Sequence, residues 1–256
     1  MFAVLQSTDA VIGGSAVLDF VLSSEREVEN FNIFAPFRTA AVVVEHLQSS
    51  QCYEVINSFS AFRAPRELMD YCVDDPCEYL AGVREVTKLQ RGGVSVDVIA
   101  SGTGGDADTA TLPLACQWTT LLMSYIGADG LCVAYPKHTF AKQGAYSVPR
   151  ICHPSLGVGT NPAPLNKYLE RGFHMFVHGC LHDDDKYEDV ACDRSICGNA
   201  ERRFGDNGCC VVPFSDGGKL AGLGTRWRFG GVPCRVAGEV VFSRSVAHAA
   251  VCEANF

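Results

Sequence analysis

The chain has no apolar run of the roughly 20 residues that a membrane-spanning helix needs. It also lacks internal repeats, low-complexity tracts and long linkers. No positively charged segment precedes the apolar start, and the polar residues from Gln6 to Asp9 interrupt it, which is not the pattern of an export signal. These absences predict a folded protein that is neither exported nor bound to a membrane.

Basic residues are also in short supply. The sequence has 21 Lys and Arg against 29 Asp and Glu, which gives a net charge of −8 and a pI of about 5.3. Nucleic-acid coats and anionic membranes need a basic face on their partner. General nucleic-acid binding is therefore not expected, whereas a local basic pocket for a nucleotide or another small molecule is compatible with this balance.

Cysteine, in contrast, is abundant. The 13 cysteines are odd in number, irregularly spaced and without an export signal, so a disulfide framework is not expected. Cys116, Cys132 and Cys152 lie in apolar stretches, which is typical of buried free thiols. The sequence thus predicts a reducing compartment, the cytoplasm or the nucleus.

Helical and strand periods alternate along the first 150 residues. They predict helices over 15–24, 39–49 and 111–126, strands over 30–35 and 131–135, and a hairpin of 83–90 and 94–100 around the turn at 91–93. Beyond residue 150, only 168–176 has helical spacing. We therefore expect an α/β fold: a small mixed sheet flanked by helices over 1–150, and an irregular, Cys-rich extension over 151–256 that packs on this core.

Three short motifs follow one another in the order of a known fold. Gly14-Ser15 opens a short helix, Asn30 and Asn32 alternate on the next strand, and Asp97 lies in a later strand. Together with VIGGSAVLDFVL, FNIFAP, VSVDVIAS, LCVAYPKHTF and KYLERGF, this order resembles the nucleotidyltransferase fold. More narrowly, it resembles a group of uncharacterised proteins of mushroom-forming fungi built on that fold. The resemblance covers residues 10–175.

The resemblance implies a nucleotide site. In that family a Gly-Ser pair precedes a strand with two alternating carboxylates, and a third carboxylate lies on a neighbouring strand. Positions 30 and 32 would point to one side of the sheet, and Asp97 would join them as the catalytic acid. Gly14 and Ser15, with Asn30 and Asn32, would bind the nucleotide. In the family, Mg²⁺ ions stabilise the transition state of the transfer.

The sequence departs from that pattern at the metal ligands. Asn30 and Asn32 stand where the family has carboxylates, and neutral amides are poor ligands for Mg²⁺. Asp106 and Asp108 would rescue a metal site only if the loop after Asp97 folds back. Three interpretations stay open. The site is degenerate but still binds a nucleotide, in a binding or interaction module. It is an active metal-dependent nucleotidyl- or phosphotransferase. The residues are ordinary structural ones. A separate function class is unrelated chemistry on this scaffold, in fungal secondary metabolism or defence.

A second candidate site lies in the Cys-rich extension. His178, Cys192, Cys197 and Cys209 are of the residue types that hold a structural zinc ion, which would help an irregular segment to fold. Their spacings match common zinc modules poorly, so buried free thiols are the alternative. Arg226-Trp227-Arg228 has the pattern of a strand with alternating faces, or of cations and an aromatic ring that stack on a base.

Overall fold

The computed structural model describes residues 1–60, 82–102, 108–147, 150, 163–177, 196–198, 200–216, 218, 220–231, 233–236 and 239–242. Its helices are α1 (Phe2–Thr8), α2 (Ser15–Val21), α3 (Phe37–Gln51), α4 (Leu112–Ala115), the 3₁₀ turn η3 (Thr120–Leu122), α5 (Pro136–Phe140) and α7 (Ala163–Glu170). Its strands are β1 (Val11–Gly13), β2 (Asn30–Ala35), β3 (Glu54–Ser60), β4 (Val83–Arg91), β5 (Val94–Ser101), β6 (Ser124–Ile126), β7 (Gly130–Val133), β8 (Gln143–Tyr146), β9 (His174–Val177), β10 (Glu201–Arg203), β11 (Cys210–Pro213), β12 (Arg226–Arg228), β13 (Pro233–Val236) and β14 (Glu239–Phe242).

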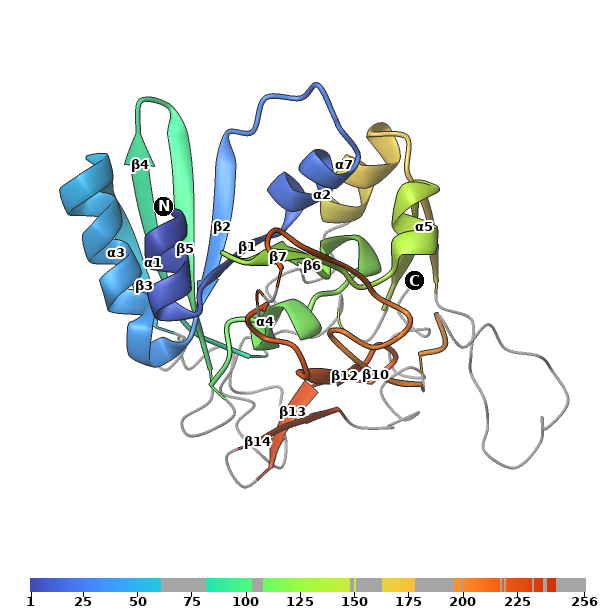
Figure 1. Cartoon of the computed structure of the whole chain (residues 1–256). Helices are drawn as coiled ribbons and strands as arrows, with labels where there is room; N and C mark the ends of the chain where they lie inside the picture. The colour runs from blue at the N-terminus through green and yellow to red at the C-terminus, as the bar shows by residue number, and fades with distance from the viewer. Residues whose placement is uncertain are drawn as a thin grey trace, which may run out of the picture.

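A mixed sheet of eight strands, in the order β11-β7-β6-β1-β2-β5-β4-β3, runs through the molecule (Figure 1). β2 and β5 are parallel, and the other neighbouring strands of this sheet are antiparallel. The α/β class and the mixed sheet flanked by helices agree with the expectation from sequence. The sheet is larger than the small one expected, because β1, β6 and β11 have only three or four residues each and show no readable alternation.

One face of the sheet is covered by α1 and α3. Ala40, Val43 and Leu47 recur at helical spacing on α3 and are buried, so this stripe is what fixes the helix against the sheet. They pack against inward-facing residues of β2 and β5, which include Ile33 and Val98. Alternate residues of a strand point to opposite faces, so the residues between them, Asn32 and Asp97 among them, belong to the other face.

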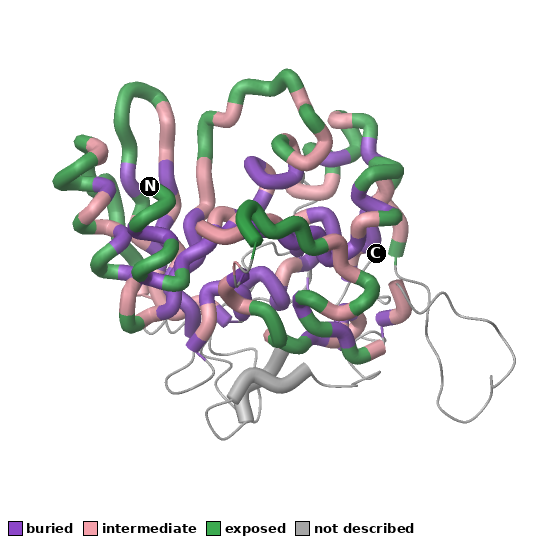
Figure 2. Tube along the Cα trace, viewed as in Figure 1, coloured by how far each residue is buried: buried purple, intermediate pink, exposed green. Residues whose placement is uncertain are grey.

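The other face of the sheet packs against the middle and the C-terminal parts of the chain. Phe34 and Tyr125 from the sheet lie in one buried cluster with Phe204, Trp227 and Phe229. β11 pairs with β7 and so extends the sheet at its edge. Figure 2 shows the buried positions gathered at the centre of the described trace. Residues on both sides of position 150 therefore share one core.

Two buried arginines connect the C-terminal part to the rest. Arg150 is fully buried and donates to the carbonyl oxygens of Ala115 (2.9 Å), Gln117 (2.7 Å), Arg228 (2.7 Å) and Gly231 (3.2 Å). Burial lowers the pKa of Arg150 to about 10, which leaves it charged at neutral pH.

Arg202, on β10, has a carboxylate partner as well as a backbone one. It donates to Ala134 O (3.1 Å) and to both carboxylate oxygens of Asp206 (2.7 and 2.8 Å). Its guanidinium also lies 4.9 Å from the ring centre of Tyr135. Both arginines thus satisfy backbone carbonyls that would otherwise be buried without partners.

The predicted helix over 111–126 is wrong. Residues 112–115 form one helical turn, 120–122 a 3₁₀ turn, and 124–126 the strand β6. Nearly every residue of this segment is buried, so its apolar residues do not mark one helical face. The hydroxyl of Thr119 donates to Ala145 O (3.0 Å), and Ala145 N donates to the hydroxyl of Thr120 (3.0 Å), which tie the segment to β8 in place of a helical turn.

The predicted helix over 168–176 is also wrong in its bounds. The helix is α7, which ends at Glu170, and residues 174–177 form β9. Gly172 stands between them with φ +79°, a conformation that glycine adopts freely and that ends a helix.

Most other predicted elements are confirmed. Residues 15–21, 30–35 and 37–51 are helix, strand and helix, and β4 and β5 form the hairpin around Gly92 and Gly93. Trp227 is buried between the exposed Arg226 and the half-buried Arg228 on β12, so this triplet is the predicted alternating strand. Among the described residues, no helix has both the length and the apolar character needed to cross a bilayer.

Candidate functional site

Asn32, Asp97 and Lys88 form a polar row across three neighbouring strands, on the sheet face opposite α1 and α3. Asn32 of β2 is paired with Asp97 of β5, and Asp97 is paired with Lys88 of β4. Side chains at paired positions of adjacent strands project to the same side, about 5 Å apart. Asn30 lies two residues before Asn32 on that side, paired with Ser95, and is exposed. The predicted site residues of β2 and β5 are thus brought together.

Gly14 closes one end of this polar row. It has φ +76°, and a Cβ atom at this position would lie 2.6 Å from Nδ2 of Asn32. A side chain at this position would have to displace the Asn32 amide and adopt a strained backbone conformation, which glycine avoids. Ser15 follows as the first residue of α2 and is half-buried. The predicted group of Gly14, Ser15, Asn30, Asn32 and Asp97 is therefore contiguous in space as well as ordered in sequence.

The polar row sits at the boundary between the core and solvent. In the next register position, Phe34 and Ile99 already pack into the buried cluster. The Asp97 side chain is 17% exposed and that of Lys88 is 51% exposed, with 3.8 Å between Asp97 Oδ2 and Lys88 Nζ. At this distance the two groups form an ion pair but no hydrogen bond. The formal charge of the polar row is therefore zero.

The polar row does not fit a magnesium site. Mg²⁺ is held in proteins by carboxylate and phosphate oxygens, and the polar row offers one carboxylate, already paired to an ammonium group. Within the described ranges of the chain, no three His, Cys, Asp or Glu side chains come together as a group that could hold a metal ion.

Asp108 does not complete the acidic site. It lies at the far end of β2, where its carboxylate accepts from the backbone N–H of Phe37 (2.9 Å) and of Arg38 (3.3 Å) at the start of α3. The hydroxyl of Ser101 donates to the same carboxylate, which is buried. Asp108 thus caps a 15-residue helix, a structural role. Asp106 lies outside the described residues.

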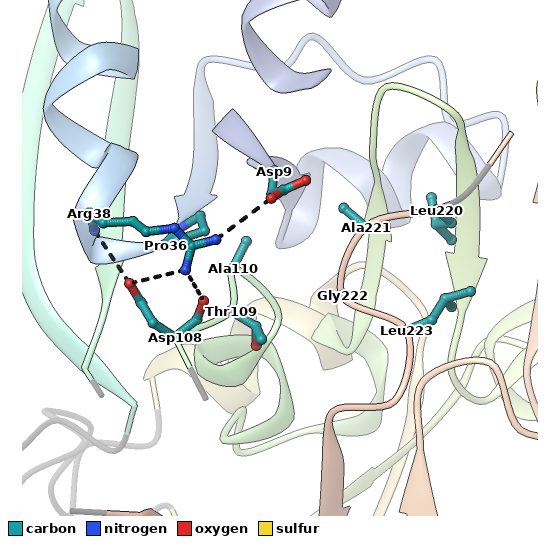
Figure 3. Close-up of a pocket in the computed structure, with 10 residues that line it drawn as sticks. All are labelled: Asp9, Pro36, Arg38, Asp108, Thr109, Ala110, Leu220, Ala221, Gly222 and Leu223. Carbon is teal, nitrogen blue, oxygen red and sulfur yellow. Dashed lines mark hydrogen bonds and ion pairs between the residues drawn. The ribbon is translucent and has the colours of Figure 1, made fainter. Parts of the chain in front are cut away.

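A pocket of about 320 Å³ adjoins Asp108 (Figure 3). Arg38 extends across it, 3.7 Å from the Asp9 carboxylate and 3.9 Å from that of Asp108. Its wall on the other side is the segment from Leu220 to Leu223. None of the residues that line the pocket belongs to the polar row, so the sequence motifs do not converge on this pocket.

The predicted zinc ligands are only partly within the described residues. His178 and Cys192 lie outside them, and Cys197 and Cys209 are free thiols. Cys209 is engaged within the protein: Arg202 Nη2 donates to its sulfur (3.7 Å), and the sulfur lies 3.4 Å from Asp206 Oδ1. A hydrogen bond from the Cys132 thiol lowers the pKa of Cys209, and the same bond and burial raise the pKa of Cys132. The zinc set stays a prediction.

Lys88 is the residue of the polar row that the sequence motifs do not point to. The signal for it was nevertheless present. A hairpin that turns at Gly92-Gly93 pairs Arg91 with Val94, and counting back along this register pairs Lys88 with Asp97.

A comparison of the chain with protein-family models found no match, and neither did a comparison with curated proteins.

Proposed function

We propose that this chain is a nucleotidyltransferase-like protein whose metal site is degenerate, and that it binds a nucleotide without transferring it. Support comes from the order of elements around the polar row. A Gly-Ser turn opens α2, the next strand carries two polar residues at alternate positions, and a third polar residue lies opposite on a parallel strand. This is the arrangement that the resemblance implied for the nucleotide site.

The observation that carries the proposal is the neutral charge of the polar row. Three carboxylates would repel a phosphate group unless metal ions stood between them. Here Asn30 and Asn32 carry no charge, and Lys88 balances Asp97. A phosphate can approach such a surface without a metal ion, whereas one carboxylate that is already paired is too few ligands for two-metal catalysis.

The side chains of the polar row are suited to direct contacts with a nucleotide. The amide of Asn offers two N–H donors and a carbonyl acceptor, which match phosphate oxygens, ribose hydroxyls and base edges. Lys88 adds an ammonium group whose side chain is 51% exposed, so it can turn to a ligand oxygen. The ligand would lie along the partly exposed polar row beside the buried core, with Gly14 and Ser15 at one end and Lys88 at the other.

The first experiment is a calorimetric titration of the full chain with each of the four common nucleoside triphosphates, once in EDTA and once with Mg²⁺. We expect at least one of them to bind in EDTA, with no gain in affinity from Mg²⁺. Binding that requires Mg²⁺ would contradict the degenerate site and support an active transferase. No binding of any triphosphate in either buffer would show that the polar row is not a nucleotide site.

A second experiment restores the missing acids. Asn30→Asp with Asn32→Asp should weaken triphosphate binding in EDTA, because two negative charges face the phosphates, and should make binding depend on Mg²⁺. A change of roughly tenfold between EDTA and Mg²⁺ is expected from one added charge-assisted contact. The matched control, Gln48→Glu with Asn207→Asp, adds the same charge at two exposed positions. Equal behaviour of the two double variants would contradict the proposal.

A further inference from the structure

The structure brings the VIGGSAVLDFVL and KYLERGF segments together, although well over a hundred residues separate them in the chain. Leu18 of α2 and Tyr168 of α7 lie in one apolar cluster with Trp118, and Leu22 and Leu165 pack against it. Figure 1 shows α7 beside α2, with the connection from α2 to β2 passing above them. The charged residues of these segments therefore meet at the edge of this apolar cluster.

Arg171, directly after α7, faces Asp19 of α2 with few contacts to satisfy it. Its Nη1 lies 4.0 Å from Asp19 Oδ2, beyond hydrogen-bond distance, and the two side chains are 11% and 13% exposed. Nε and Nη1 of Arg171 are buried and have no hydrogen-bond partner among the residues that the structure describes. Its guanidinium otherwise lies 5.5 Å from the ring centre of Tyr168. Buried donors without acceptors are unfavourable, so this guanidinium has unused capacity for an oxyanion.

Two more cations take part in the electrostatic interactions around Arg171. Lys167 is four residues earlier, on α7, and Arg26 lies on the exposed connection from α2 to β2 (Figure 2). Partial burial, then Arg171 and Arg26, lower the pKa of Lys167, and Asp19 acts in the opposite direction. Burial raises the pKa of the Tyr168 phenol, and the same three charged residues, Arg171, Asp19 and Arg26, also act on this pKa. We name Arg26, Lys167 and Arg171 the cation cluster: three positive charges around one carboxylate.

The cation cluster is connected to the polar row through α2. Asp19 is four residues after Ser15 on α2, hence on the same side of the helix and about 6 Å along it. Ser15 follows Gly14, against which the Asn32 amide packs. The connection that carries Arg26 leads directly into Asn30. A ligand that begins at Asn32 and extends along α2 would therefore reach the cation cluster.

We propose that Arg26, Lys167 and Arg171 bind the phosphate groups of the nucleotide, in place of the metal ions for which the polar row has no ligands. This inference rests on the proposed function and extends it. A guanidinium group presents paired N–H donors that match two oxygens of a phosphate, and an ammonium group adds a compact charge. Arg26, Lys167, Arg171 and Asp19 together carry a net charge of +2, which balances part of the charge of a polyphosphate. Glu25, Glu27, Glu29 and Glu170 neighbour them in the sequence.

The test uses the full chain in EDTA, titrated calorimetrically with pyrophosphate, with the nucleoside triphosphate that binds most tightly and with the corresponding nucleoside. Arg171→Gln should abolish pyrophosphate binding and weaken the triphosphate by roughly tenfold or more. Binding of the nucleoside should not change. Arg203→Gln, at an exposed arginine of β10, is the matched control and should leave all three affinities unchanged.

Two further variants keep the test decisive where Arg171→Gln does not fold. Lys167→Gln, at an exposed position of α7, should weaken the binding of pyrophosphate and of the triphosphate but not the binding of the nucleoside. Asp19→Asn should raise the affinity for pyrophosphate and for the triphosphate several-fold, because it removes the carboxylate that competes for Arg171. A purely structural ion pair would not give this opposite sign.

The outcomes separate this inference from the proposed function. Triphosphate binding in EDTA that is equal in wild type, Lys167→Gln and Asp19→Asn would overturn the role of the cation cluster and leave the nucleotide site standing. Pyrophosphate binding that responds to these variants, without binding of any triphosphate, would support the anion site and contradict the nucleotide proposal.

Discussion

The polar row and the surroundings of Arg150 place polar groups in the same fold in opposite ways. Arg150 is fully buried, and its guanidinium donates to four carbonyl oxygens from two segments of the chain. In the polar row, Asp97 and Lys88 are 3.8 Å apart, and Asn30 is exposed. Satisfied and buried polar groups hold segments together, whereas loosely paired ones at the edge of a core are free to exchange partners for a ligand. The contrast fits a role in stability for the first region and the proposed binding role for the second.

The largest effect on stability is expected from Arg150→Met. This change removes the donors but leaves the carbonyls of Ala115, Gln117, Arg228 and Gly231 buried without them. We expect a loss of roughly 3 kcal/mol or more in the free energy of unfolding, measured by urea denaturation. The control Arg203→Met, at an exposed position, should change it by less than about 0.5 kcal/mol. Equal effects of the two substitutions would show that the buried hydrogen bonds of Arg150 do not stabilise the fold more than an exposed arginine does.

A smaller, pH-dependent effect is expected at Asp206. Partial burial alone would raise the pKa of this carboxyl group, but hydrogen bonds from Arg202 and from the backbone N–H groups of Arg203 and Gly208 outweigh it and lower the pKa to about 2. In the unfolded chain an aspartate titrates near pH 4. The carboxylate therefore stabilises the fold fully above about pH 4, and this stabilisation is lost as the pH falls towards 2.

Asp206→Asn should lower the free energy of unfolding at pH 7 by on the order of 1–3 kcal/mol. Between about pH 4 and pH 2, the free energy of unfolding of the variant should also fall less steeply than that of the wild type. Urea denaturation at a series of pH values measures both quantities. An unchanged slope in the variant would show that Asp206 does not titrate with this low pKa.

The smallest effect on stability is expected from Asp97→Ala. The ion pair with Lys88 is long, and the Lys88 side chain is half exposed, so its loss should change the free energy of unfolding by less than about 1 kcal/mol. The same variant should alter triphosphate binding, which the calorimetric titration measures. A loss of several kcal/mol in stability would instead make Asp97 a structural residue and would place the polar row with Arg150.

The sequence predicts α2, β2, α3, the β4-β5 hairpin and β7, but it does not predict α1, β1 or β3 and is wrong over 111–126. The difference has a physical reason. β4 and β5 each have one face towards the core and one away from it, so their alternation is visible, and Gly92-Gly93 marks the turn between them. Residues 111–126 are buried on nearly all sides, so no periodicity remains to tell a helix from turns and a short strand. The C-terminal strands depend on partners such as Arg150, which lie far away in the sequence.

The candidate site was likewise predictable in part. The spacing of Asn30 and Asn32 and the alternation around Asp97 indicate that these residues share a face, and the register of β2 and β5 brings Asn32 opposite Asp97. The approach of the Asn32 amide to Gly14 and the position of Arg171 beside Asp19 are tertiary contacts that no local pattern encodes. The cation cluster therefore emerges only when α2 and α7 are seen side by side.

The pairing of β11 with β7 has a consequence for how the protein is made. During synthesis β7 leaves the ribosome long before β11 exists, and the aromatic residues Phe204, Trp227 and Phe229 follow later still. Until then one edge of the nascent sheet keeps its backbone groups unpaired, beside an apolar surface that lacks its cover. Such an edge is a template for other strands. Nascent chains on the same messenger RNA would therefore be most prone to associate with each other after β7 is synthesised and before β11 is.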